Sequence, residues 1–182
     1  MDFTHYTDHS VQAAADLVNT RGSTTGNEYM GTPEQVAKFL AEHDFRAPHR
    51  VTKADIAQLH DLRDRLRDVF LSEDEKKAAR ILNQLLEELD VMPYLTDHDG
   101  DWHIHYAPED ASLGRRVAAA TAMGLATVIS TYGFDRLGVC AADNCKDVFV
   151  DMSRNKSRRF CNDICCTRMN VAAYRARAKQ KA

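Results

Sequence analysis

Apolar residues recur at helical spacing along most of the chain. These repeats predict helices over about 9–18, 33–43, 53–71, 73–89 and 110–132. Thr32 and Thr52 each stand directly before a predicted helix and are typical N-caps. Pro33 in the first turn and Asp55 three residues after Thr52 strengthen these two starts. Ser72 is the candidate cap of the fourth helix.

Two segments depart from the helical period. Residues 19–33 break all periodicity and carry three glycines, which predicts a loop. Along residues 102–106 apolar and polar side chains alternate, and the dipeptide Asp99-Gly100 precedes them, so residues 92–108 are predicted to form a β-hairpin. The first part of the chain is therefore expected to be mainly α with one small β-hairpin.

The last part of the chain has a different pattern. A short β segment at 147–151 is followed by a polar turn at 153–159 and then by a helix over about 163–179. We place a domain boundary at about residues 135–137, which separates a helical domain at 1–136 from a β-hairpin plus helix at 137–182.

All five cysteines lie in this C-terminal part. Cys140 and Cys145 form one short-spaced pair, and Cys161 and Cys165 form a second pair after a hairpin-sized insert. Two such pairs are typical of a tetrahedral four-thiolate zinc site, and four protein ligands make the zinc structural. A zinc-ribbon-like hairpin plus helix is therefore predicted, which would need the metal to fold.

Three alternatives to this assignment stay open. The four cysteines could be reduced core residues, although polar neighbours such as Asp143 and Lys146 disfavour a core position. An iron–sulfur cluster also takes four thiolates, but two separated pairs favour zinc. Cys166 directly follows Cys165 and could replace it as the ligand, since adjacent residues rarely both bind one metal.

The charge of the chain is strongly asymmetric. Residues 151–182 carry nine Lys or Arg and two Asp, a net charge of +7, whereas residues 1–150 carry −10. This split favours a basic segment that meets a polyanion, with DNA as the expected partner. The alternative is a solvated basic helix beside an acidic body. The sequence has no long apolar run for a membrane span and no signal peptide at its start, so a cytoplasmic location is expected.

Several short motifs resemble a known family. Phe149 with Asp151, the run 153–155, the run 158–161 and Tyr174-Arg175 all match the pattern of CGNR zinc fingers. The naming tetrad is CCTR at 165–168, which keeps its first Cys and its Arg but not the central Gly-Asn, and this supports Cys165 as the ligand.

The first part of the chain resembles the ABATE domain that usually precedes this finger. The matching pieces are DLVNT at 16–20, TPEQVAKFL at 32–40, LRDRLRDVF at 62–70 and DGDWHIHY at 99–106. The resemblance implies a stress-related transcription regulator with a zinc finger.

Basic residues of the turn and the last helix are the candidate nucleic-acid contacts. They are Arg154, Lys156, Arg158, Arg159, Arg168, Arg175 and Lys179. Arg168 could instead support the thiolates. On a helical wheel, Ile164, Val171, Tyr174 and Ala178 share one side, which is expected to pack on the hairpin and leave the basic stripe at the surface.

The helical body offers a possible small-molecule pocket. Asn19 and the mid-helix Arg63 could converge beside Trp102, although Asn19 could also satisfy helix-end carbonyls. His103 and His105 are expected at the surface. Because no catalytic pattern is found, we expect a regulator whose body senses a ligand or forms a homodimer, and not an enzyme. A protein-interaction module is the alternative.

Overall fold

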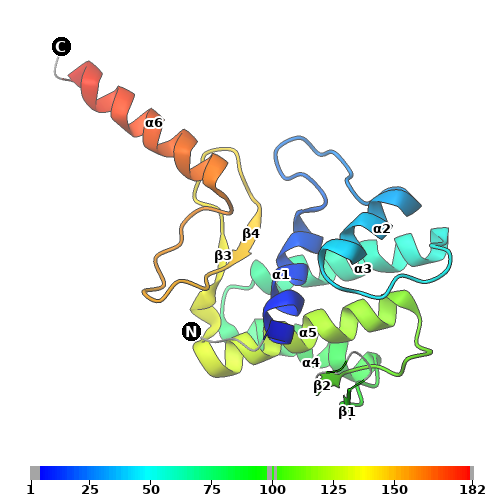
Figure 1. Cartoon of the computed structure of the whole chain (residues 1–182). Helices are drawn as coiled ribbons and strands as arrows, with labels where there is room; N and C mark the ends of the chain where they lie inside the picture. The colour runs from blue at the N-terminus through cyan, green and yellow to red at the C-terminus, as the bar shows by residue number, and fades with distance from the viewer. Residues whose placement is uncertain (1–4, 98–99, 101, 181–182) are drawn as a thin grey trace.

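The computed structural model describes residues 5–97, 100 and 102–180 of the chain. Five helices form the body of the molecule. They are α1 (His5–Asn19), α2 (Pro33–Glu42), α3 (Lys53–Phe70), α4 (Glu75–Glu88) and α5 (Leu113–Tyr132). Helix α5 is buried along most of its length and packs against α1, α3 and α4 (Figure 1). All five helices predicted for the body are confirmed.

The starts of these helices follow their capping residues. Thr32 and Thr52 cap their helices as predicted, and both form complete capping boxes, of which only the one at Thr52 was expected. The prediction that Ser72 is the N-cap of α4 is wrong. Its hydroxyl donates to the carbonyl of Asp68 at 2.8 Å, at the C-terminal end of α3. Asp74 caps α4, and its carboxylate accepts the backbone N–H three residues further on.

A small antiparallel hairpin precedes α5, as the alternation predicted. It consists of β1 (Tyr94–Thr96) and β2 (His103–His105), with Leu95 opposite Ile104. The predicted turn includes Asp99, which lies outside the described residues, while Gly100 has a positive φ of 97°.

A second hairpin follows α5 and a short 3-10 helix (Phe134–Arg136). It pairs β3 (Leu137–Val139) with β4 (Val148–Val150) in antiparallel register. Strand β4 is buried throughout and packs against α1, so that Leu137, Val148 and Val150 belong to the same apolar core as the body helices. The core is thus continuous across residues 136–137, where we place the domain boundary.

The last helix, α6 (Asp163–Gln180), extends away from the rest of the molecule (Figure 1). Among the described residues it is the first turns of α6 that pack on other elements, where Cys165 and Met169 join a small cluster with the other cysteines of the two pairs. The prediction that its apolar side covers the hairpin is wrong, since Ile164, Val171 and Tyr174 are 78%, 41% and 68% exposed. The helix axis leads away from the hairpin (Figure 1), and these side chains are therefore left largely exposed.

The fold is therefore mainly helical, with two small antiparallel hairpins, the second of which leads through a cysteine cluster into a helix. Among the described residues, no helix is long and apolar enough to cross a membrane.

Candidate metal centre and nucleic-acid interface

Four cysteines from two separate loops meet beside the second hairpin. The Sγ atoms of Cys140, Cys145, Cys161 and Cys165 all lie within 4.8 Å of one another. Cys161 is 3.7 Å from both Cys145 and Cys165, measured between Sγ atoms. Four sulfurs placed ~2.3 Å from a tetrahedral zinc would be about 3.8 Å apart. The cluster therefore has the dimensions of a four-thiolate zinc site and can hold a zinc ion.

Backbone hydrogen bonds place the first cysteine pair. The N–H of Cys140 donates to the carbonyl of Asp147 at 2.8 Å, and the N–H of Cys145 donates to the carbonyl of Ala142 at 3.1 Å. Asn144 has a positive φ of 61°, which lets the chain turn sharply between these contacts. The segment 140–148, which we call the first knuckle, is thus folded back so that both thiols point to one side.

The second pair is placed by the start of α6. The side chain of Asn162 accepts the backbone N–H of Cys165 at 2.9 Å and so caps the helix. The neighbouring Cys166 is not part of the cluster, and its Sγ lies 3.5 Å from the side-chain nitrogen of Asn170. Of the two adjacent cysteines, the geometry therefore brings Cys165 to the metal position.

The electrostatics of the cluster favour a bound cation. Burial and the nearby thiols raise the pKa of Cys161 far above its ordinary value, and burial also raises the pKa of Cys145. Burial acts in the same direction on Cys140, but the backbone N–H groups of Cys161 and Ala142 outweigh it and lower the pKa of Cys140. Four thiolates at this spacing repel one another, so a divalent ion is needed to hold them all deprotonated.

Three of the predicted nucleic-acid residues already have partners inside the molecule. Arg158 donates to the backbone carbonyls of residues 150, 160 and 161, and its guanidinium lies 5.0 Å from the centre of the Phe149 ring. Lys156 pairs with Asp135 at 2.7 Å. Arg168 donates to the carbonyl of Asp143 at 2.9 Å and lies 3.8 Å from the thiol of Cys165, which is the supporting role considered for it.

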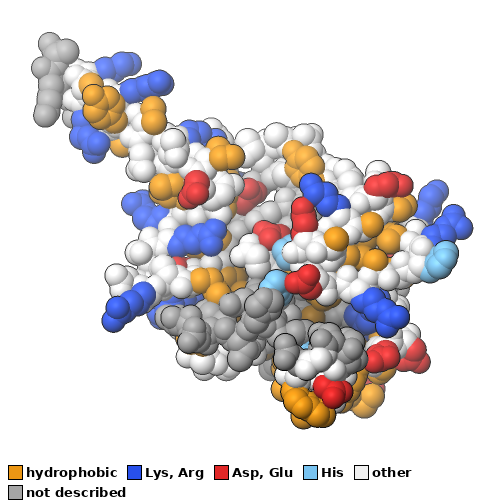
Figure 2. Space-filling view, in the orientation of Figure 1, with side chains coloured by type: hydrophobic (Ala, Val, Ile, Leu, Met, Phe, Trp, Pro, Cys, Tyr) orange, Lys and Arg blue, Asp and Glu red, His pale blue; other side chains and the backbone are white. Residues whose placement is uncertain are grey.

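The other predicted basic residues remain exposed. Arg159 lies over the Phe160 ring, with 5.8 Å between its guanidinium carbon and the ring centre. Within the described part of the chain, no polar partner is seen for the side chains of Arg154, Arg175 and Lys179, nor for that of Arg177, which was not among the predicted contacts. Lys and Arg side chains follow α6 and the outer side of the finger in Figure 2, whereas acidic side chains lie mainly over the helical body.

Asp151, at the end of β4, organises the basic turn. Its carboxylate accepts the N–H groups of Ser153 at 2.8 Å and Arg158 at 2.9 Å. Burial raises the pKa of Asp151, but these hydrogen bonds and the charge of Arg136 outweigh it and keep that pKa below its ordinary value. The charged form of Asp151 therefore stabilises the turn that presents Arg154.

Comparison with protein families agrees with this architecture. The family model called ABATE, described as "Putative stress-induced transcription regulator", matches residues 12–132. The chain belongs to the ABATE family. A second model, the CGNR zinc finger, matches residues 136–178, so the order of the two parts is the one predicted. No curated protein matches the chain.

Two of the three pocket candidates are engaged in hydrogen bonds within the molecule, Asn19 with the finger and Arg63 within the ABATE body. Asn19 makes two hydrogen bonds with the backbone of Val148, which lies 129 positions further along the chain. Arg63 is buried and donates to Glu28 at 2.8 Å and to Thr20 at 3.2 Å. Trp102 is 69% exposed on the first hairpin. The structure therefore does not bring the three residues together around one cavity.

Cavities in the ABATE body lie elsewhere. Asn19 borders a cavity of about 420 Å³ between α1 and α2, together with Asp16, Phe39 and His43. A larger cavity of about 640 Å³ lies between α3, α4 and the start of α5, where Arg65 and Arg115 line it. On β2, His103 and His105 lie 3.0 Å apart between their Nε2 atoms and are partly buried rather than fully at the surface.

The residues that pair with Arg63, and those that link the body to the first knuckle, were not predicted from the sequence. Glu28 pairs with Arg63, Ser23 and Thr24 contact the first knuckle, and Arg67 donates to the carbonyl of Lys146 at 3.4 Å. Their only sequence signal is their position in or opposite a glycine-rich loop, and a loop pattern does not show what the loop contacts.

Proposed function

We propose that this ABATE protein is a zinc-dependent DNA-binding transcription regulator, in which the finger contacts DNA through α6 and the turn at 153–159. The observation that carries the proposal is the placement of α6. It projects from the zinc cluster with exposed cations that have no polar partner in the described chain. DNA phosphates are the polyanion that such a surface fits.

The physical state of α6 also supports a partner. Beyond its second turn nearly every described residue is exposed, so tertiary packing contributes little to the stability of this helix. Isolated helices shorter than about 15 residues are marginal in water, and the exposed stretch of α6 at 171–179 is shorter than that. Ion pairs of Arg175, Arg177 and Lys179 with phosphates would supply the missing stabilisation.

Zinc is required in this proposal because it fixes the start of α6. Cys165 lies in the first turn of the helix, whereas Cys140 and Cys145 lie in the first knuckle, which Ser23 and Thr24 of the body contact. With the metal bound, α6 and the turn that carries Arg154 are held in one fixed orientation relative to each other. Without it, the basic residues are no longer presented as one surface.

A pair of double variants tests the proposal. We expect Arg175→Glu with Lys179→Glu to weaken binding of a fluorescent random duplex by about tenfold or more at low salt, because two phosphate contacts become repulsive. The matched control is Lys76→Glu with Arg80→Glu on exposed positions of α4, which changes the net charge equally. Anisotropy titrations measure the affinity, and elemental analysis checks that zinc is retained.

Equal loss of binding in both double variants would refute a role for α6 and leave only the effect of net charge. If the intact zinc protein ignores DNA at low salt, the surface of α6 is instead a docking site for an acidic protein. The exposed Ile164 and Tyr174 favour that second function, because apolar side chains at a helix surface are common in protein contacts.

The body would supply the regulation. The 640 Å³ cavity between α3, α4 and α5 has the size of a small-molecule site and supports the ligand-sensing role. A homodimer stays a prediction.

A further inference from the structure

A side chain of the body pairs with the backbone of the finger. At the end of α1, the amide nitrogen of Asn19 donates to the carbonyl of Val148 at 2.9 Å, and the N–H of Val148 donates to the amide oxygen of Asn19 at 2.8 Å. The pairing uses both the N–H and the carbonyl of Val148, which is the last residue of the first knuckle and the first residue of β4. Both hydrogen bonds are partly buried, so water competes weakly for them.

The loop that follows Asn19 contacts the knuckle itself. The hydroxyl of Ser23 donates to the carboxylate of Asp147 at 2.6 Å and accepts the N–H of Lys146 at 2.9 Å. The same oxygen lies 4.0 Å from the Sγ atom of Cys145. Thr24 donates to the carbonyl of Asn144 at 2.6 Å. We call Asn19, Ser23 and Thr24 the clasp.

Asp147 connects the clasp with the second cysteine pair. One of its carboxylate oxygens accepts from Ser23, while the other lies 3.7 Å from the Sγ atom of Cys161. The backbone carbonyl of Asp147 accepts the N–H of Cys140. The clasp therefore acts on segments that carry three of the four cysteines, although it contributes no ligand.

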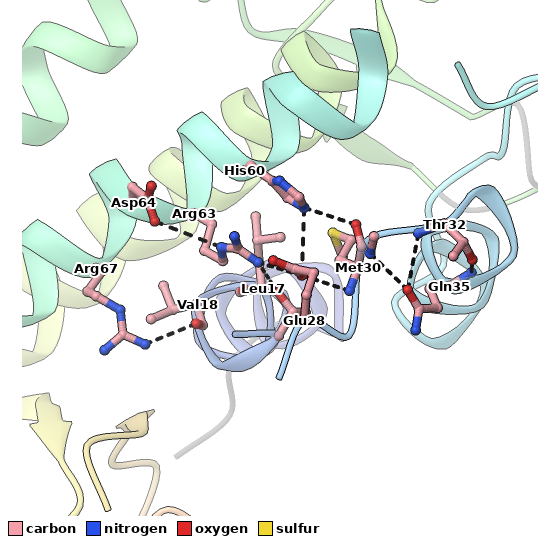
Figure 3. A network of polar contacts seen from close by, with 12 residues as sticks. Leu17, Val18, Glu28, Met30, Thr32, Gln35, His60, Arg63, Asp64 and Arg67 are labelled. Carbon is pink, nitrogen blue, oxygen red and sulfur yellow. Dashed lines mark hydrogen bonds and ion pairs between the residues drawn. The ribbon is translucent and has the colours of Figure 1, made fainter. Parts of the chain in front are cut away.

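The clasp is in turn held by α3. Ser23 and Thr24 lie in the loop at 20–31, which we call the clasp loop. Arg63 donates to Thr20 and Glu28, which lie on either side of these two residues. Figure 3 shows the contact of Arg63 with Glu28 and that of His60 with the carbonyl of Met30, which is 3.0 Å long. Burial raises the pKa of Glu28, but its hydrogen bonds with Arg63 and the Met30 N–H outweigh that effect and lower the pKa. The ionised Glu28 thus keeps the loop tied to the helix.

We propose that the clasp is a positioning element of the zinc site, through which the ABATE body sets how tightly the finger holds its metal. A knuckle that is already ordered by Asn19, Ser23 and Thr24 loses less conformational entropy when zinc binds than a free loop would. Contacts that orient metal ligands typically change metal affinity by about 10-fold to 100-fold. The coupling is reciprocal, so zinc stabilises the clasp loop by the same factor.

The proposal goes beyond metal binding by the finger alone. It rests on the zinc site but not on DNA binding. A change in the body that shifts the loop at 20–31 would alter zinc retention and the anchoring of α6 together. The finger would then be controlled by the body without a ligand that touches the metal.

Transfer of zinc to a chromogenic chelator tests the clasp in the full-length protein. We expect Ser23→Ala, which removes one hydroxyl, to lower zinc affinity by about tenfold, and Asn19→Ala to lower it by more. Asn19→Asp keeps the acceptor for the Val148 N–H but loses the donor, so its zinc affinity is expected to lie between those of the wild type and Asn19→Ala. Gln12→Ala is the matched control, since Gln12 is exposed on α1 and, among the described residues, its side chain hydrogen-bonds with Asp16 and not with the finger.

A cycle of metal and mutation separates positioning from general stability. Thermal unfolding is measured for the wild type and Ser23→Ala, each with and without zinc. We expect zinc to raise the midpoint less in Ser23→Ala than in the wild type. Equal zinc effects in both proteins, or zinc affinities that match the Gln12→Ala control, overturn the proposal. These readouts contain no DNA, so their failure is distinct from a failure of the proposed function.

Discussion

Val148→Ala tests whether the finger hairpin is part of the body core. Val148 is 1% exposed and packs in the same core cluster as α1 and α5, although it lies in the segment matched as a zinc finger. The substitution removes two buried methyl groups at about 0.8 kcal/mol each, and the remaining cavity adds to this. We expect a loss of about 2.5 kcal/mol, or roughly 5–10 °C in the unfolding midpoint.

Denaturant unfolding followed by circular dichroism measures this change, with zinc present throughout. Val139→Ala is the matched control because Val139 lies opposite Val148 in the hairpin and is 38% exposed. An exposed position of this kind should change stability by about 0.5 kcal/mol or less. Equal effects of the two substitutions, or no loss for Val148→Ala, would refute a shared core.

Three further outcomes follow from the same contacts. Glu28→Ala should lower the free energy of unfolding, measured with denaturant, by about 3 kcal/mol because it leaves Arg63 charged and buried. Glu28→Gln should lower it by less, and equal losses would argue against the ion pair. Asp151 has a pKa lowered from 3.8, so its stabilising effect is complete above about pH 4 and is lost as the pH falls further; Asp151→Asn should flatten this acid decline. Chelation followed by limited proteolysis should remove the residues after about 151 and leave β4 on the body; a fragment that ends near residue 136 would contradict this.

Much of the fold is local and could be predicted from the sequence. The body helices follow from apolar periodicity, and Thr32 and Thr52 mark two helix starts because a cap acts within one turn. The cysteine spacing indicated a four-thiolate cluster for a similar reason, since each pair is brought together by its own short turn. The tetrad at 165–168 favoured Cys165 over Cys166, and the geometry of the cluster supports that choice.

The remaining features depend on contacts between distant segments. Asn19 and Val148 are 129 positions apart, and nothing near either residue shows that the two pair. The wheel of α6 groups Ile164 and Tyr174 on one side but does not show whether another element covers that side. The structure leaves both exposed because the helix leads away from the hairpin.

Zinc titration of the metal-free chain in the presence of labelled duplex DNA tests the central claim most directly. At low salt we expect the anisotropy to rise with added zinc and to level off at one zinc per chain, because one four-thiolate site orders α6. With about four phosphate contacts, log affinity of the zinc form should fall against log salt with a slope of roughly −4. A metal-free chain that binds DNA equally well, or a zinc form that does not bind at low salt, would contradict the account.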